Sequence, residues 1–437
     1  MRRCVLAMIA MCGLAAGAFA DDWPQFMGPQ RDGVWREEGI IDKFPPGGPP
    51  IRWRTKIAPG YAGPAVAGGR VFVTDRIVDD NAEAPSSVWD RGSIPGVERV
   101  LCLDEKDGRI LWKHEYRRNY TMSYSSGPRA TPLVSGGRVY SFGAEGDLQC
   151  RAVEDGRLIW EKRLPNTPTW GYAPAPLIEG DRLICMQNVK DGCVLALDKD
   201  TGRELWRAVK SRECGYCAPV VYEAGGTRQL IAWTPEALVS LDPRTGRQYW
   251  SHEFPTMYGV TVSMPRKAGD LLFVGGANEG IRMFRLASDK PSAEPLWKRG
   301  GRSETVTDSI HSLMCTPVYK DGYIYGVCIY GQLRCVSGED GHRIWETMAA
   351  TTGAKPAWCA NAFIIPQGDR YFIPNEKGDL IIARLSPKGY EEIGRAHLLE
   401  PTNTDANRKV VWSPPALANR CIFMRNDREI ICAELGR

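Results

Sequence analysis

A short segment that ends in tryptophan recurs along the chain. Its three fullest copies read VLCLDEKDGRILW, VLALDKDTGRELW and LVSLDPRTGRQYW. In five copies a glycine preceded by Asp or Thr stands four residues before the tryptophan. Such a pair is typical of hairpin turns, because glycine adopts positive φ without steric cost. The tryptophans that close the copies lie 44 to 59 residues apart: Trp53, Trp112, Trp160, Trp206, Trp250, Trp297 and Trp345. A period of this length predicts a repeat architecture.

A second series of turns runs in step with the first. Eight two-residue turns, most of them containing glycine, separate short apolar runs such as PAVAGGRVFVT and PLIEGDRLICM. A third series adds one more turn to each unit, so a unit contains four short antiparallel strands. No window shows a sustained apolar period of 3.6, which argues against a solenoid of helices. The pattern therefore predicts an all-β fold, an eight-bladed β-propeller with four antiparallel strands per blade.

The two ends of the repeat are incomplete and complement each other. The last unit, RCIFMRNDREIICAEL, has three strands at most and no closing tryptophan. Trp53, in PIRWRTKI, has no strands of its own before it. We therefore expect the N-terminal strand to pair with the C-terminal blade and close the ring, which removes the exposed edges of an open sheet.

The seven closing tryptophans are predicted to be structural blade-docking residues. Each would lie at the end of an outermost strand, with its ring flat against the glycine turn of the neighbouring blade. Ten residues before the tryptophan the side chain is small in five copies, and Cys432 occupies a similar place in the last unit: Cys102, Cys150, Ala196, Ser240 and Cys335. This column indicates buried cysteines that act as small apolar side chains and need no bridge.

The remaining cysteines leave alternatives open. Fourteen cysteines are present, and twelve remain when Cys4 and Cys12 of the first twenty residues are set aside. Bridges between Cys328 and Cys335, or within the lone CxxC of ECGYC, would be reasonable in an oxidising compartment. No second CxxC or paired histidine stands near ECGYC, so a packed strand start is favoured over a metal or redox site, and no metal site is predicted.

The first twenty residues have the features of a cleaved secretory signal. Arg2 and Arg3 precede a short apolar run, and AAGAFA provides a cleavage site after Ala20. Lipidation at Cys12 is the less favoured alternative, because Met11 is larger than the residue usually found before a lipidated cysteine. The mature chain is expected to be exported to the periplasm or the cell envelope.

The mature chain is expected to form a single domain. Residues 21–50 would be an N-terminal segment packed on one propeller of residues 51–437. Loss of Arg2 and Arg3 lowers the formal net charge from +4 to +2, and no concentrated basic face suggests a nucleic-acid partner. No later segment is long and apolar enough to span a bilayer, and the protein is expected to be a monomer.

These residues make the chain resemble the PQQ-like β-propeller repeat family. The family motif A-x-D-x-x-T-G-x-x-x-W is most complete at Ala196, Asp198, Thr201, Gly202 and Trp206. The resemblance covers about residues 50 to 435 and implies the propeller fold. It includes the outer-membrane β-barrel assembly lipoprotein, exported bacterial propellers that share the opening WPQFMGPQRDG, and, more distantly, quinoprotein dehydrogenases. The motif determines the fold strongly and the function weakly.

The resemblance makes pyrroloquinoline quinone (PQQ) with calcium a possible cofactor, but the site residues do not support it. Family dehydrogenases commonly have adjacent cysteines stacked on the quinone, and this chain has no Cys-Cys pair and no C-x-x-C-H haem site. The Asp-rich LDKDTG is a turn with too few oxygen ligands for calcium. We therefore expect no cofactor.

A ring of aromatic residues is predicted on the face of the disk where each connection enters an innermost strand. One candidate per blade is found there, with Arg129 as an added polar contact: Tyr61, Tyr124, Tyr172, Tyr216, Tyr258, His311, Trp358 and Trp412. These rings would line a funnel that binds a ligand, or would pack between blades. The long insertion at residues 76–99 adds Trp89 as an exposed anchor or a lid.

The sequence favours an exported non-enzymatic scaffold or binding protein. Its partner, an envelope protein or a small planar or saccharide ligand, would engage the aromatic face of the channel. The alternatives are a PQQ-dependent oxidoreductase and a hydrolase or lyase that acts on saccharide in the channel. Paired carboxylates facing each other would support the last of these. No catalytic residue is identified.

Overall fold

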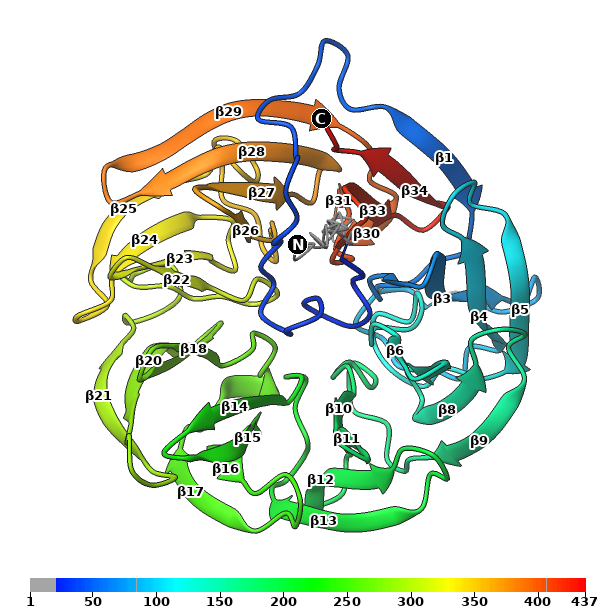
Figure 1. Ribbon diagram of the computed structural model, residues 1–437, viewed down its shortest axis with the longest axis horizontal. Helices are drawn as coiled ribbons and strands as arrows, with labels where there is room; N and C mark the ends of the chain where they lie inside the picture. The colour runs from blue at the N-terminus through cyan, green and yellow to red at the C-terminus, as the bar shows by residue number, and fades with distance from the viewer. Residues whose placement is uncertain (1–20, 84, 406) are drawn as a thin grey trace, which may run out of the picture.

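Eight four-stranded antiparallel sheets surround a central axis and form the predicted eight-bladed propeller (Figure 1). The computed structural model describes residues 21–437 except 84 and 406, so the expected signal sequence lies outside the described residues. From the axis outward, blades one to four are β2 (Ala65–Ala67), β3 (Arg70–Val78), β4 (Gly96–Asp104) and β5 (Ile110–Arg117); β6 (Leu133–Ser135), β7 (Arg138–Phe142), β8 (Asp147–Ala152) and β9 (Leu158–Arg163); β10 (Leu177–Glu179), β11 (Arg182–Met186), β12 (Asp191–Asp198) and β13 (Glu204–Lys210); and β14 (Val220–Ala224), β15 (Thr227–Trp233), β16 (Ala237–Leu241) and β17 (Gln248–Glu253).

The remaining blades follow the same order. Blades five to seven are β18 (Arg266–Ala268), β19 (Leu271–Gly276), β20 (Gly280–Leu286) and β21 (Ala293–Arg299); β22 (Val318–Lys320), β23 (Tyr323–Val327), β24 (Leu333–Ser337) and β25 (Arg343–Thr347); and β26 (Ile365–Gln367), β27 (Arg370–Pro374), β28 (Asp379–Ser386) and β29 (Gly389–His397). A 3-10 turn (Met257–Gly259) precedes blade five, and the hairpin β30 (Asn403–Asp405) and β31 (Arg408–Val410) lies between blades seven and eight.

Blade eight closes the ring as predicted. Its strands are β32 (Ala416–Ala418), β33 (Cys421–Arg425) and β34 (Glu429–Glu434), and β1 (Ile51–Lys56) adds the outermost strand. Within this pairing Trp53 lies opposite Cys432. The first and last strands of the chain thus share one sheet, and the ring has no open radial edge.

Each closing tryptophan near a glycine turn meets that turn in the next blade. A Cβ added to Gly108 would lie 2.5 Å from the Trp53 ring, and one added to Gly156 would lie 2.6 Å from Trp112. The indole Nε1 of Trp53 also donates to the Glu105 carbonyl of that turn at 2.8 Å. The tryptophan is near the start of the outermost strand, not at its end as expected, because the strand begins within two residues of the glycine.

Blade five changes the partner of one tryptophan. Its outer turn, residues 287–292, contains no glycine, and the Trp250 Nε1 donates instead to Gln229 Oε1 of its own blade at 2.8 Å. Trp345 faces blade seven, where the Ser386 carbonyl accepts its N–H at 2.7 Å. Trp250 and Trp345 therefore keep an indole hydrogen bond, whereas the indole N–H of Trp206, which lies over the Gly246 turn, has no partner among the described residues.

The column of small residues lies directly opposite the tryptophans. Cys102 pairs with Trp112, Cys150 with Trp160, and Ala196 with Trp206. A register shift follows each of these pairs, which gives the wide indole room on the pleated surface. All twelve cysteines of the described chain are buried and unbridged, which resolves the two disulfides left open above.

Residues 21–50, the strap, cross one face of the disk (Figure 1). Trp23 forms an isolated bridge with Val66 of blade one, and Ile40 forms one with Gly436 near the C-terminus. Between these points the buried Arg31 donates to the carbonyls of Ala175, Pro176 and Pro219 at 2.7 to 3.0 Å. The strap is thus fastened to several blades at once.

Arg31→Ala is expected to loosen the strap. It would leave three buried carbonyls without their donor, at a cost of about 2 to 3 kcal/mol in local stability. Limited chymotrypsin digestion should cut after Phe26 or Trp35 at least tenfold faster than in the wild type. Arg36→Ala, which removes an exposed ion pair with Asp32 and an exposed hydrogen bond to the Val34 carbonyl, should leave the rate nearly unchanged. Equal rates in both variants would show that Arg31 does not fasten the strap.

The two faces of the disk differ in what covers them. Strand direction alternates within a blade, so the strap face contains the turns between the first and second strands. The opposite face, called the open face here, contains the turns between the second and third strands and the connections into each innermost strand.

No helix of the described residues has the length and apolar character needed to cross a membrane.

Candidate functional site

Exposed apolar side chains gather on the open face. Among the described residues, ten large hydrophobic side chains are well exposed, and seven of them lie on this face. Five belong to its connections and turns, with Tyr258 at 74% the most exposed, and two are the last residues of β3: Trp89, Met257, Tyr258, Val306 and Trp358, then Ile77 and Val78. The other three, Ile110, Leu158 and Ile344, are in outermost strands. Where such side chains are contiguous, they mark a candidate interaction surface.

Four aromatic rings on this face form a continuous row, which we call the aromatic row. It runs from Trp89 to Tyr124, Trp412 and Tyr61, with successive ring centroids 5.0, 6.1 and 6.3 Å apart. The four residues come from the insertion of blade one and from the connections into blades two, eight and one. Three of them are partly buried and Trp89 is exposed. The insertion thus folds over the connections and extends the row.

Arg129 supports the row from beneath. Its guanidinium lies 5.1 Å from the centroid of the Tyr61 ring and donates to the carbonyls of Ser123, Tyr124 and Gly127. Tyr124 has a φ of 53°, a left-handed conformation that costs a non-glycine residue energy and is often found at functional sites. The bonds from Arg129 hold that backbone in place. Burial lowers the pKa of Arg129, yet a guanidinium stays charged.

Polar groups lie alongside the row. The Tyr61 hydroxyl donates to Ser126 Oγ at 3.2 Å, and the Tyr124 hydroxyl reaches Asp405 at 3.4 Å. Asp427 accepts the backbone N–H of Gly60 and has no ion pair among the described residues. Burial raises the pKa of both Asp405 and Asp427. The Trp412 Nε1 is shielded from solvent and has no hydrogen-bond partner in the described chain.

Two carboxylates meet at Arg408 of the β30–β31 hairpin. Arg408 pairs with Glu376 of blade seven and with Asp405 at 3.0 Å. Both carboxylates are buried, and burial raises the pKa of Glu376 as it does that of Asp405. Glu376 also accepts the backbone N–H of Asn361. The arginine between the acids anchors the hairpin, so the pair lacks the open approach that a glycosidase needs.

The other candidates do not join the row, so the eight residues do not form one ring. Tyr172 and His311 are fully buried. The Tyr172 hydroxyl donates to the Pro165 carbonyl at 2.5 Å. His311 Nδ1 lies 3.0 Å from the Ala277 carbonyl and Nε2 lies 3.0 Å from Thr307 Oγ1. Burial also lowers the pKa of His311, which leaves it neutral and packed between blades.

Tyr216, Tyr258 and Trp358 lie apart from one another. Tyr216 is buried and packs on Trp170, with ring centroids 5.2 Å apart. Trp358 packs edge-on against Tyr330 at 5.3 Å and is 40% exposed. Tyr258 projects from the 3-10 turn into solvent. The predicted funnel is therefore a row on one side of the channel mouth, with isolated rings elsewhere.

Sequence reasoning missed the β30–β31 hairpin and its polar side chains. Asn403, Asp405 and Arg408 lie in TNTDANRKVV, which has no glycine turn and falls outside the repeat register. Asp427 lies in the second turn of blade eight, between β33 and β34, where an aspartate is a common turn residue and gives no functional signal. The length of the connection gives no signal for the hairpin, because residues 398–415 between β29 and β32 are no more numerous than residues 300–317 between β21 and β22.

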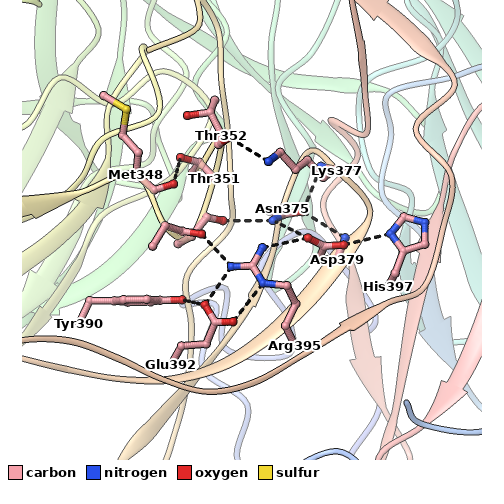
Figure 2. Close-up of polar contacts among 12 residues, drawn as sticks. Met348, Thr351, Thr352, Asn375, Lys377, Asp379, Tyr390, Glu392, Arg395 and His397 are labelled. Atoms are coloured by element: carbon pink, nitrogen blue, oxygen red, sulfur yellow. Dashed lines mark hydrogen bonds and ion pairs between the residues drawn. The ribbon is translucent and has the colours of Figure 1, made fainter. Parts of the chain in front are cut away.

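A second polar cluster lies at the outer part of blade seven (Figure 2). Asp379, the first residue of β28, accepts from Arg395 Nη1 at 2.9 Å and from His397 Nδ1 at 3.0 Å. Arg395 also binds Glu392 twice and donates to the Ala349 carbonyl after blade six. Arg395 and Asn375 of blade seven donate to the carbonyls of Ala349 and Ala350, which follow blade six, so the cluster joins the two blades.

Asp379→Asn is expected to reduce stability in a pH-dependent manner. Burial acts to raise the pKa of Asp379, but hydrogen bonds from His397, Arg395 and Asn375 outweigh it and hold the pKa below its ordinary value. The contribution is present above about pH 4 and is lost as the pH falls through the folded-state pKa. The unfolding midpoint in urea should differ between wild type and variant at pH 6, and the difference should shrink at pH 3. Asp369→Asn, 85% exposed on the same blade, is the control. A difference that does not change with pH would contradict this assignment.

The residues do not fit a calcium-bound quinone. In the described chain, no three His, Cys, Asp or Glu side chains converge in an arrangement that could hold a metal ion. The carboxylates nearest the row already have partners. Glu376 and Asp405 pair with Arg408, Asp405 also accepts from the Tyr124 hydroxyl, and Asp427 accepts the backbone N–H of Gly60. Adjacent cysteines are absent from the sequence.

Comparisons with known proteins agree with this fold. The family model described as outer membrane protein assembly factor BamB matches residues 96–347 and 241–436. A relative of that description from Burkholderia pseudomallei is 22% identical over 235 residues, which cover 52% of this chain and 58% of its own length. This chain therefore spans less than two thirds of that relative.

Two solved structures share the architecture. BamB from Moraxella catarrhalis superposes with a TM-score of 0.51 at 14% identity, covering 82% of this chain and 98% of that one. Quinohemoprotein alcohol dehydrogenase ADHIIG from Pseudomonas putida HK5 gives a TM-score of 0.61 at 11% identity, covering 95% and 80%. Identities this low show the fold alone. The family model covers most of the chain, and the protein therefore belongs to the PQQ-like β-propeller family whose model is described as outer membrane protein assembly factor BamB.

Proposed function

We propose that this protein is a non-enzymatic binding propeller of the bacterial cell envelope, and that a partner protein docks on its open face. The observation that carries the proposal is the distribution of exposed apolar side chains. Most of them lie on the same face as the aromatic row, while the strap crosses the other face. Large exposed aromatic side chains on a rigid scaffold are typical anchors of protein interfaces.

The family supports a binding role, since its description and that of the Burkholderia relative name an assembly factor. The signal-like first twenty residues support an envelope location, with cleavage after Ala20 favoured over lipidation at Cys12. The poor fit to a calcium-bound quinone disfavours a dehydrogenase. The Arg408-bound carboxylates likewise disfavour a saccharide hydrolase.

Site-specific photocrosslinking in cells that express the chain natively tests the docking face. A benzoylphenylalanine at position 89 or 358 on the open face should give a discrete adduct with a protein. The same residue at position 158, an apolar and 38% exposed site in β9, should give none. Adding excess purified wild-type protein to opened cells should reduce the adduct. Equal adducts at all three positions, or none at 89 and 358, would refute the docking face.

A further inference from the structure

We infer that the aromatic row binds a proline-rich segment of the partner in the polyproline II conformation, with a basic residue beside the prolines. This inference rests on the proposed function and names the chemistry of its partner. The row, its rigid support and the charges around it carry the inference.

The shape of the row suits a ridged ligand better than a flat one. The planes of neighbouring rings are inclined by 84° between Trp89 and Tyr124, 41° between Tyr124 and Trp412, and 31° between Trp412 and Tyr61. Inclined rings leave notches between them, whereas stacking of a planar cofactor requires parallel faces. Proline rings of a polyproline II helix dock in aromatic-lined grooves of this kind.

The length of the row also agrees with such a helix. Polyproline II rises about 9 Å in each turn of three residues. Three successive ring spacings of 5.0 to 6.3 Å therefore accommodate about two turns. A segment of six or seven residues could contact all four rings.

The row is held in one arrangement before any ligand arrives. The Tyr124 backbone N–H donates to the Val88 carbonyl at 2.7 Å, and Ser123 Oγ donates to the Trp89 carbonyl at 2.7 Å. These bonds tie the insertion to the connection that Arg129 supports. A rigid row of rings and a stiff ligand both lose little conformational freedom on binding, which favours association.

One hydrogen-bond donor at the row, the indole N–H of Trp412, is available to a carbonyl of such a ligand. A polyproline II segment makes no internal hydrogen bonds, so its carbonyls need external donors. The Tyr61 and Tyr124 hydroxyls and the Asn403 amide already donate to Ser126 or Asp405. The donor at the row that has no partner among the described residues is Trp412 Nε1. The unpartnered Trp412 Nε1 would gain an acceptor after a small rotation of its side chain.

The charges near the row favour a basic neighbour. Asp90, which directly follows Trp89, is exposed and forms no ion pair among the described residues. Asp427, which accepts the backbone N–H of Gly60 next to Tyr61, also lacks one there. Arg129 donates to backbone carbonyls, and the exposed Arg91 of the insertion donates to the Thr121 carbonyl. A lysine or arginine beside the prolines would complement this acidic border.

Peptide titration with the full mature chain tests the inference. A fluorescein-labelled peptide of about twelve residues, with repeated Pro-Pro pairs and one arginine, should bind saturably by fluorescence anisotropy. Replacing the prolines by alanine should abolish binding, and replacing the arginine by glutamate should weaken it at least fivefold. Trp89→Ala, which changes an exposed side chain, should weaken binding at least tenfold, whereas Tyr258→Ala on the same face should not change it.

The outcomes separate this inference from the proposed function. Equal binding of the proline and alanine peptides, or no effect of Trp89→Ala, overturns the inference. Absence of peptide binding alongside a position-specific crosslink at residue 89 overturns it too, but leaves the docking face standing. Binding of neutral oligosaccharides that competes at the row would also overturn it.

Discussion

Gly156→Ala is expected to destabilise the protein by about 2 to 4 kcal/mol, because it combines backbone strain with a steric clash. Gly156 has a φ of 74°, and an added Cβ would meet three atoms of the Trp112 ring at 2.6 to 3.1 Å. The ring is held by blade two, where its Nε1 donates to the Val153 carbonyl at 2.9 Å, so it cannot retreat without losing that bond. The free energy of unfolding from urea titration measures the effect.

Gly136→Ala is the matched control. Gly136 belongs to the same blade and also has positive φ, at 57°, but an added Cβ would meet no atom within 4 Å. The Gly136→Ala substitution therefore adds backbone strain without a steric clash, and it should lower the free energy of unfolding by about 1 kcal/mol. If the two variants lose equal stability, the contact between indole and glycine does not stabilise the blade interface.

Trp53→Ala should cost about 3 to 5 kcal/mol, the usual loss for a buried tryptophan. Trp53 is 7% exposed, packs against Phe423 with centroids 6.0 Å apart, and lies over the Gly108 turn. It belongs to β1, the strand that joins the two ends of the chain. Its loss should therefore weaken ring closure as well as one blade contact.

Trp53→Phe distinguishes packing from hydrogen bonding. It keeps an aromatic ring and removes the bond from Nε1 to the Glu105 carbonyl, so the expected loss is about 1 to 2 kcal/mol. Urea titration of both variants, read by circular dichroism, measures the two losses. A loss below about 1 kcal/mol for Trp53→Ala would contradict the role of this tryptophan in closing the ring.

The fold could be predicted because short local sequence patterns, namely the glycine turns and the incomplete units at the two ends of the repeat, determine it. The glycine turns require positive φ, and the structure has it at Gly108, Gly156 and Gly202. The incomplete last unit and the isolated Trp53 predicted the pairing of β1 with β34. The prediction that the tryptophan lies at the end of its strand was wrong. The tight glycine turn lets the outermost strand begin within two residues of the glycine, so the tryptophan lies near the start of the strand.

The site could be predicted only in part. The connections into the innermost strands contain the aromatic residues, and three of the eight candidates, Tyr61, Tyr124 and Trp412, do form the row with Trp89. The sequence does not reveal whether an aromatic side chain in a connection points into the protein or toward solvent. Tyr172 and His311 turn inward and find backbone acceptors, whereas Tyr258 turns outward, because the loop backbone and the neighbouring blade set the direction.

Calorimetric titration of the mature, tag-free protein with PQQ, with and without calcium, tests most directly whether this propeller is a binding protein rather than a quinoprotein. Dye-coupled oxidation of alcohols and sugars would be followed on the same samples. We expect no binding heat and no turnover, because the groups around the row do not form a calcium site. Saturable, calcium-dependent binding with turnover would contradict the proposal, and the residues of the aromatic row would then be ligands of a cofactor.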